Sequence, residues 1–179
     1  MSREEILHTF YGTVEYTKSG EHWKTVFRPE MVKIGKLSHD LIDGNTGKVV
    51  AAEGAKMNLR FARKLQTEGL NEVLVYQDDL IGRYIAIDII NENTGEVYAE
   101  AGDEITPALL ETINTVGIET IPTLDIDHVN IGAYLRNTLM ADKNLTREDA
   151  LVDIYRILRP GEPPTIEGAE ALFRGFFFD

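Results

Sequence analysis

Few side chains in this sequence have the types and spacing of a reactive or metal-binding centre. The closest approach is Asp125, Asp127 and His128, which place two carboxylates and an imidazole close together along the chain. Such groups can ligate a divalent metal, but no second set of ligands is evident elsewhere. We therefore interpret this segment as a linker, with a metal site as the alternative.

The stretch DGNTG at residues 43–47 has the look of half a calcium loop. An EF-hand loop ends in a bidentate glutamate, and none stands at the required distance. Asn and Gly supply the positive φ angles of tight turns. The stretch therefore predicts a hairpin turn.

Other catalytic classes lack their characteristic residues. The sequence has no cysteine, which excludes disulfides, zinc ribbons, iron–sulfur clusters and a thiol nucleophile. It has no G-x-S-x-G, P-loop or G-x-G-x-x-G motif, and His8, His22 and His39 have no metal-like spacing. We expect no catalytic residue and no metal site in this chain.

The charge is unevenly distributed. The 179 residues carry 18 Lys and Arg against 30 Asp and Glu, a net charge of -12, which argues against a free-standing nucleic-acid binder. Residues 40–127 carry six basic and seventeen acidic side chains, whereas residues 1–39 sum to +1 and residues 128–179 to -2. We expect the acidic middle to be repelled by a polyanion, so that an end segment would approach one.

The N-terminal residues lack the apolar core of a signal peptide, and no apolar run reaches the length of a membrane span. A cytoplasmic location is therefore the default expectation.

The middle of the chain contains an internal repeat. Residues 40–75 lie over residues 88–123 at a shift of 48 without a gap, and ten of the 36 aligned pairs are identical. Each copy predicts a hairpin, a helix and a strand. Asn58 and Thr106 are the expected helix N-caps, and Gly69 and Gly117 the expected helix stops, with residues 118–121 as the second copy's final strand.

The N-terminal region predicts a short amphipathic run at residues 4–10, then a hairpin of strands 12–16 and 23–27 joined by residues 18–20. Its apolar content is Phe10, Tyr11, Val14, Trp23, Val26 and Phe27. Aromatic residues on a hairpin can stack on single-stranded bases. Core packing is the interpretation we favour, with stacking as the alternative.

The C-terminal region predicts helices. Residues 131–140 have helical spacing, a capping box at Thr146 begins a helix with an apolar face at residues 151–158, and a proline-rich turn ends it. Thr165 caps a last helix. The three phenylalanines at 176–178 would need cover, so we expect the chain to be part of a longer one.

The most distinctive stretch of the sequence is residues 150–165 (ALVDIYRILRPGEPPT), continued by residues 169–173 (AEALF). This stretch closely resembles part of the β subunit of bacterial DNA-directed RNA polymerase. Residues 125–128 (DIDH) and 134–139 (YLRNTL) also resemble that family, and upstream the resemblance continues at the level of pattern.

The resemblance implies a fragment of the lobe, one jaw of the cleft that holds DNA, with residues 40–127 as a lineage-variable surface insertion. The parent complex would be a nucleotidyltransferase acting in transcription, with β′, α, ω, a sigma factor and DNA as partners. Its catalytic Mg²⁺ would be held by carboxylates of β′, so this fragment would be non-catalytic and need no cofactor. Alone, it is expected to bind DNA weakly or not at all.

Within that resemblance, the candidate DNA contacts are Arg156 and Arg159, with Arg174 as a weaker third. The planar guanidinium can donate two hydrogen bonds to one phosphate. For Arg159 two alternatives stay open: it satisfies the last carbonyls of its helix, or it pairs with Glu162.

The predicted fold class is α+β. The N-terminal hairpin (1–39) and the C-terminal helices (128–179) would form part of a lobe, with the duplicated hairpin–helix–strand unit (40–127) inserted between them. The alternative function is a free-standing acidic module that binds a basic protein.

Overall fold

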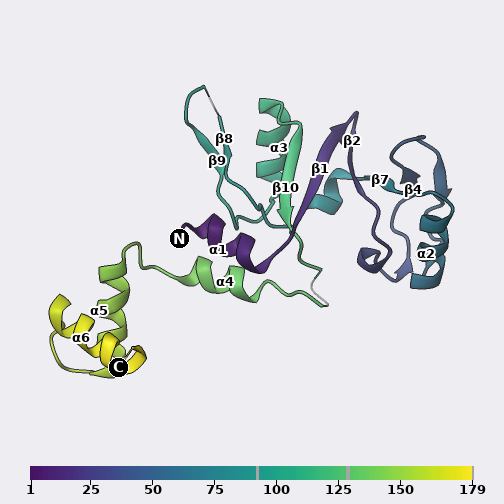
Figure 1. Ribbon diagram of the computed structural model, residues 1–179. Helices are drawn as coiled ribbons and strands as arrows, with labels where there is room; N and C mark the ends of the chain where they lie inside the picture. The colour runs from purple at the N-terminus through teal and green to yellow at the C-terminus, as the bar shows by residue number, and fades with distance from the viewer. Residues whose placement is uncertain (92, 128–129, 179) are drawn as a thin grey trace. The chain divides into compact units, whose positions relative to one another are not determined.

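The computed structural model describes residues 1–91, 93–127 and 130–178, and it is an α+β structure (Figure 1). The chain divides into two compact units, residues 1–137 and residues 138–179. The units are described separately below.

In the described residues of the first unit there are ten short strands and three helices, and a fourth helix, α4 (Tyr134–Ala141), spans the boundary of the two units. The helices are α1 (Arg3–Phe10), α2 (Leu59–Thr67) and α3 (Pro107–Val116), with 3-10 turns η1 (Pro29–Met31) and η2 (Gln77–Leu80). The strands are β1 (Thr13–Ser19), β2 (His22–Val26), β3 (Gly35–Lys36), β4 (Leu41–Asp43), β5 (Val49–Ala51), β6 (Lys56–Met57), β7 (Glu72–Val75), β8 (Ile89–Ile90), β9 (Val97–Ala99) and β10 (Thr120–Leu124).

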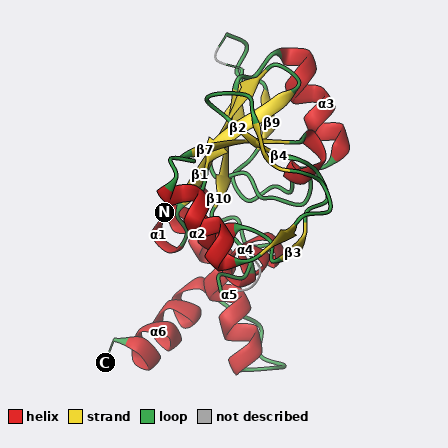
Figure 2. Ribbon diagram, turned by 90° about the vertical axis from the view of Figure 1, so that its right-hand side faces the viewer, coloured by secondary structure: helices red, strands yellow, loops and turns green. Residues whose placement is uncertain are grey.

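The β1–β2 hairpin lies inside the main sheet, whose strand order is β10-β1-β2-β7-β4-β5 (Figures 1 and 2). β1 pairs antiparallel with β10, and β2 pairs antiparallel with β7. Because β7 and β10 end the first and second repeat copies, the hairpin joins the two copies. The predicted boundaries at residues 39 and 127 therefore do not coincide with the compact units, since this sheet crosses residue 39.

The hairpin turn, predicted at residues 18–20, is residues 20–21, because residues 18 and 19 belong to β1. Ser19 is opposite His22, and Gly20 occupies the left-handed region at φ 61°. Of the predicted apolar content, Tyr11, Trp23 and Phe27 are buried, whereas Phe10 and Val26 are 66% and 62% exposed. Val26 is exposed because successive side chains of a strand point to opposite faces, and Trp23 takes the buried one.

Two hydrophobic cores flank the hairpin, and it contributes to both. Trp23 packs with Ile105, Leu110 and Ile113 of the second copy, while Phe27 packs with the core of the first copy. The indole N–H of Trp23 has no hydrogen-bond partner within the described residues. Trp23 therefore stabilises the fold by packing, and the Lys18 ammonium lies 4.7 Å from its ring centroid.

Backbone hydrogen bonds recur in the two copies at the 48-residue spacing. The Gly54 N–H donates to the Leu37 carbonyl at 2.9 Å, and the Gly102 N–H donates to the Ile85 carbonyl at 2.8 Å. Asp40 and Asp88 each accept from a backbone N–H thirteen residues later, at 2.7 and 2.6 Å. The same local structure is thus built twice.

The hairpin turn predicted at residues 43–47 is confirmed. The Asp43 carboxylate accepts from the N–H groups of Asn45 and Thr46, which lowers its pKa, and β4 pairs antiparallel with β5. In the second copy, the Asn91 amide oxygen accepts from Asn93 and Thr94 in the same way.

The predicted helix ends of the repeat are also confirmed. The Asn58 side chain accepts from the Phe61 N–H, and the Thr106 hydroxyl accepts from the Leu109 N–H. Gly117 ends α3 at φ 80°, a backbone conformation that favours glycine. The second copy's strand, predicted at residues 118–121, instead runs to Leu124 as β10. It passes through Pro122, which lacks only its own N–H and whose carbonyl accepts from Ala86.

The second unit consists mainly of α5 (Arg147–Leu158) and α6 (Ile166–Phe177) (Figure 2). Their core contains Leu151, Tyr155 and Ala169. Thr146 and Thr165 cap these helices as predicted, each accepting from a backbone N–H three residues later. The helix predicted at 131–140 begins later, at Tyr134. Among the described residues, no helix has the length and apolar character to cross a membrane.

Replacing Trp23 by alanine should destabilise the first unit by about 3–5 kcal/mol, because it removes a fully buried indole from the joined core. Urea unfolding of the chain measures this change. The matched control is Val26→Ala on the exposed face of the same strand, which should change stability by no more than about 0.5 kcal/mol. Equal effects of the two substitutions would contradict this description of the core.

Candidate functional site

The three arginines predicted as DNA contacts lie on the surface of the second unit. Arg156 stands in the last turn of α5, Arg159 is the residue that ends α5, and Arg174 stands in the last turn of α6. Their side chains are 61%, 51% and 69% exposed. Solvent, and hence a phosphate, can reach all three.

Each of these arginines is paired with a carboxylate of its own unit. Arg156 contacts Asp153 at 3.0 Å, Arg159 contacts Glu162 at 3.4 Å, and Arg174 contacts Glu170 at 3.1 Å. For Arg159, the structure therefore shows the pair with Glu162, which was one of the two alternatives that the sequence left open. Exposed ion pairs contribute only about 0–1 kcal/mol, so exchange for a phosphate is energetically feasible. Their contact with DNA stays a prediction.

The proline-rich turn after α5 is held by Tyr155. This buried tyrosine donates its hydroxyl to the Glu162 carboxylate at 2.9 Å, and the Arg159 guanidinium lies 5.8 Å from the ring centroid. Glu162 thus contacts both residues, and the turn keeps Arg159 in one place. This arrangement can present a cation at a defined position.

Glu170 links the two helices of this unit. Its carboxylate accepts from Arg147 at 2.7 Å and from Arg174 at 3.1 Å. These hydrogen bonds lower the pKa of Glu170 from 4.5 to about 2, and the bond from Arg147 has the larger effect. The Glu170 side chain is partly exposed, at 26%, so salt should weaken the interaction in part.

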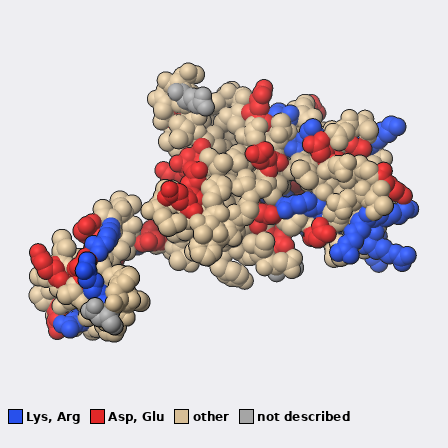
Figure 3. Space-filling model, in the orientation of Figure 1, with Lys and Arg blue, Asp and Glu red and all other residues tan. Residues whose placement is uncertain are grey.

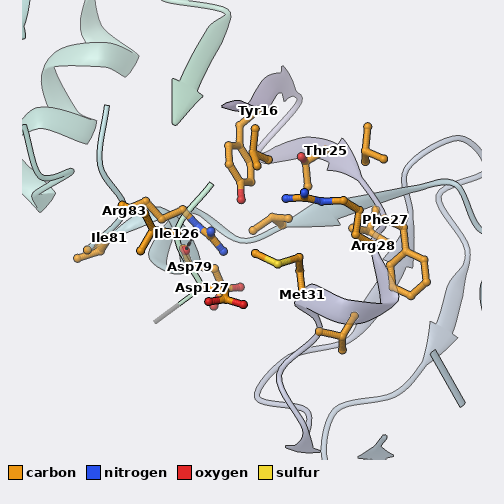
Figure 4. A pocket seen from close by; sticks show the side chains of 16 residues that line it. Tyr16, Thr25, Phe27, Arg28, Met31, Asp79, Ile81, Arg83, Ile126 and Asp127 are labelled. Carbon is orange, nitrogen blue, oxygen red and sulfur yellow. Dashed lines mark hydrogen bonds between the residues drawn. The ribbon is translucent and has the colours of Figure 1, made fainter. Parts of the chain in front are cut away.

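The first unit contains a cavity of about 350 Å³ on one face of the sheet. Figure 4 shows the hydroxyl of Tyr16 and the guanidinium groups of Arg28 and Arg83 pointing toward it. Burial raises the pKa of Tyr16. Arg28 donates to both carboxylate oxygens of Asp125 at 2.6 and 2.9 Å, and Arg83 donates to the Asp79 carbonyl. The cations of this cavity therefore have internal partners.

Asp125 and Asp127, the carboxylates of the alternative metal site, also have structural roles. Both Asp125 oxygens bind Arg28, and Asp127 accepts from the backbone N–H groups of Asn130 and Ile131. His128 lies outside the described residues. Over residues 1–91, 93–127 and 130–178, no three His, Cys, Asp or Glu side chains group as a metal site.

The charge difference between residues 40–75 and residues 76–127 was not predicted, because the charge of residues 40–127 was counted as a whole. Residues 40–75 carry five acidic and five basic side chains, whereas residues 76–127 carry twelve acidic and one basic. Figure 3 shows Lys and Arg side chains gathered over the α2 end of the first unit. A charge count made separately for each copy would have revealed this difference from the sequence.

No family model matches the chain. Curated proteins do match it along its entire length. It is 51% identical over 179 residues to a protein of Rhizobium leguminosarum bv. trifolii, 51% over 183 residues to one of Caulobacter sp. (strain K31), and 47% over 191 residues to one of Dinoroseobacter shibae. The chain spans only 13–14% of the length of these relatives.

The chain is thus homologous to one continuous segment of a much longer bacterial protein. Each of these relatives is named DNA-directed RNA polymerase subunit beta. By sequence the chain belongs, as a segment, to the RNA polymerase β-subunit family, and the predicted resemblance is confirmed.

Glu170→Gln should reduce the acid sensitivity of the second unit. Because the folded pKa is depressed, the carboxylate contributes stability above about pH 4.5, and this contribution is lost as pH falls toward about 2. Thermal unfolding across this pH range should show a smaller drop for the variant than for the wild type. Glu167→Gln, at an exposed carboxylate of the same helix without an ion pair in the described residues, is the control. An unchanged pH profile for Glu170→Gln would contradict the assigned interactions.

Proposed function

We propose that this chain is a non-catalytic segment of an RNA polymerase β subunit and acts in DNA-templated transcription. The observation that carries the proposal is about 50% identity to β subunits over the whole chain. The parent complex is a nucleotidyltransferase in this proposal, and its catalytic Mg²⁺ belongs to the partner β′ subunit.

Within the parent, the segment is a lobe that helps to form the DNA cleft, and residues 40–127 are a surface insertion. The surface of the second unit supports a place within something larger. Phe176, Phe177 and Phe178 are 64%, 65% and 74% exposed, and Ile157 is 79% exposed. Contiguous apolar side chains of this kind usually pack against further protein.

The proposed partners are β′, α, ω, a sigma factor and DNA, in the cytoplasm. Arg156, Arg159 and Arg174 are the proposed contacts to DNA phosphates. Their exposure supports this role, and their pairing with carboxylates explains why the isolated chain would gain little from these three contacts.

A free-standing acidic module that binds a basic protein is the second candidate. The concentration of twelve acidic side chains in residues 76–127 favours it. Affinity capture with the full chain from lysate distinguishes the two. A basic protein recovered without other polymerase subunits would support the module, and recovery of polymerase subunits would support the segment.

The proposed function is tested by an immunoblot of source-cell lysate with antibody raised against this chain. A band many times larger than the 20.1 kDa chain, co-eluting with RNA polymerase activity, is the expected result. A band at the size of the chain itself would contradict the proposal.

In assembled polymerase, the triple substitution R156A/R159A/R174A should shorten the lifetime of promoter complexes. If all three side chains contact phosphates, the slope of log K against log salt should fall by about 2.7. Lys143→Ala, at an exposed lysine of the same unit, is the control and should leave both quantities unchanged. Wild-type behaviour of the triple variant would show that these arginines do not contact DNA.

A further inference from the structure

The two repeat copies share a fold but differ in surface charge. Residues 40–75 hold five basic and five acidic side chains, whereas residues 88–123 hold no basic and eight acidic ones. At equivalent positions, Lys48 corresponds to Glu96, Lys56 to Glu104 and Arg63 to Glu111. Since both copies make the same local hydrogen bonds, the fold does not require cations at these positions.

Within the described residues, most cations make a hydrogen bond, ion pair or ring contact, and those that do not are clustered in sequence. All 18 Lys and Arg residues are described, and twelve of them make a hydrogen bond, ion pair or ring contact. The remaining six are Lys33, Lys36, Lys48, Lys56, Arg60 and Lys143. Five of these six lie between residues 33 and 60.

The positions of three of these cations oppose stability. Lys36 and Lys56 are direct partners across the antiparallel β3–β6 pair, and like charges placed opposite each other destabilise a sheet. Arg60 lies in the first turn of α2, where the helix dipole disfavours a cation. In the second copy, the corresponding residues are Tyr84, Glu104 and Ala108, so no repulsion arises there.

Arg60 and Arg63 lie on α2, Lys56 lies three residues before it, and β3 pairs with the strand that holds Lys56. Arg60 and Arg63 are separated by three residues and share a helix face, and η1, two residues before Lys33, contacts α2. We call Lys33, Lys36, Lys56, Arg60 and Arg63 the α2 basic surface; all five are exposed. Figure 3 shows Lys and Arg side chains gathered over this end of the unit.

We propose that the α2 basic surface binds the sugar–phosphate backbone of duplex DNA. The choice of DNA rests on the proposed function, which brings the segment next to a duplex. A duplex carries a negative charge about every 1.7 Å along its axis, so it can engage exposed cations from several elements without a base-specific contact. A stabilising role does not account for Lys36, Lys56 and Arg60, because their placement is repulsive.

Residues 40–127 were expected to turn away from DNA as a whole. The α2 basic surface changes that expectation for residues 40–75. The net charge of -11 belongs to residues 76–127, while residues 40–75 are neutral overall and expose a cationic face. The duplicated unit thus combines one surface that attracts a polyanion with one that repels it.

The test compares DNA binding by the 179-residue chain and its K36A/K56A/R60A variant. Fluorescence anisotropy with a short random-sequence duplex is recorded over a series of low salt concentrations. Wild type should bind weakly with a clear salt dependence, and the variant should lose about 2.7 from the slope of log K against log salt. The variant should unfold at the same or a higher temperature, because the Lys36–Lys56 repulsion is gone.

The control is R3A/K143A/R147A, which removes the same number of charges outside both proposed DNA-contact sets. It should keep most of the wild-type affinity of the isolated chain. Absence of binding by wild type, equal losses in both triple variants, or tighter binding to polyglutamate than to DNA would each overturn the inference. The last result would indicate an acidic protein as the partner. None of these results bears on the immunoblot, so failure here and failure of the proposed function are distinguishable.

Discussion

The pairing of the β1–β2 hairpin with the last strand of each repeat copy is the interaction on which the first unit depends. β1 pairs with β10 and β2 with β7, so neither strand of the hairpin is an edge. The same hairpin sends Trp23 into the core beside α3 and Phe27 into the core beside α2. The two repeat copies, each too small to bury much apolar surface alone, thereby form one compact unit.

The duplication separates the requirements of the interior from those of the surface. Turn and loop contacts recur at 48-residue spacing, and the two helices begin with equivalent side-chain caps. Outside this shared framework, the charge is reversed at three equivalent positions. The interior contacts are kept while the surface charge differs, so we infer that binding rather than folding determines this charge. The α2 basic surface is therefore informative about binding.

Local features were predictable from the sequence, and long-range ones were not. Asn58, Thr106 and Thr165 act on backbone groups three residues away, so their caps could be identified from neighbouring residues. The β1–β10 pairing joins residues about a hundred positions apart and leaves no local pattern, so the hairpin was assigned to a separate segment. In the candidate site, the Arg159–Glu162 pair was foreseen because it is local, whereas the opposition of Lys36 and Lys56 depends on strand register.

The most direct test of this account is native-state hydrogen exchange of the whole chain, resolved by residue. If the hairpin joins the two copies, hydrogen-bonded amides of β1, β2, β7 and β10 should exchange with one common free energy of opening. Their protection should also fall together when Trp23 is replaced by alanine. If β1 and β2 exchange through a separate, easier opening while β7 and β10 stay protected, the hairpin does not hold the copies together and the account is wrong.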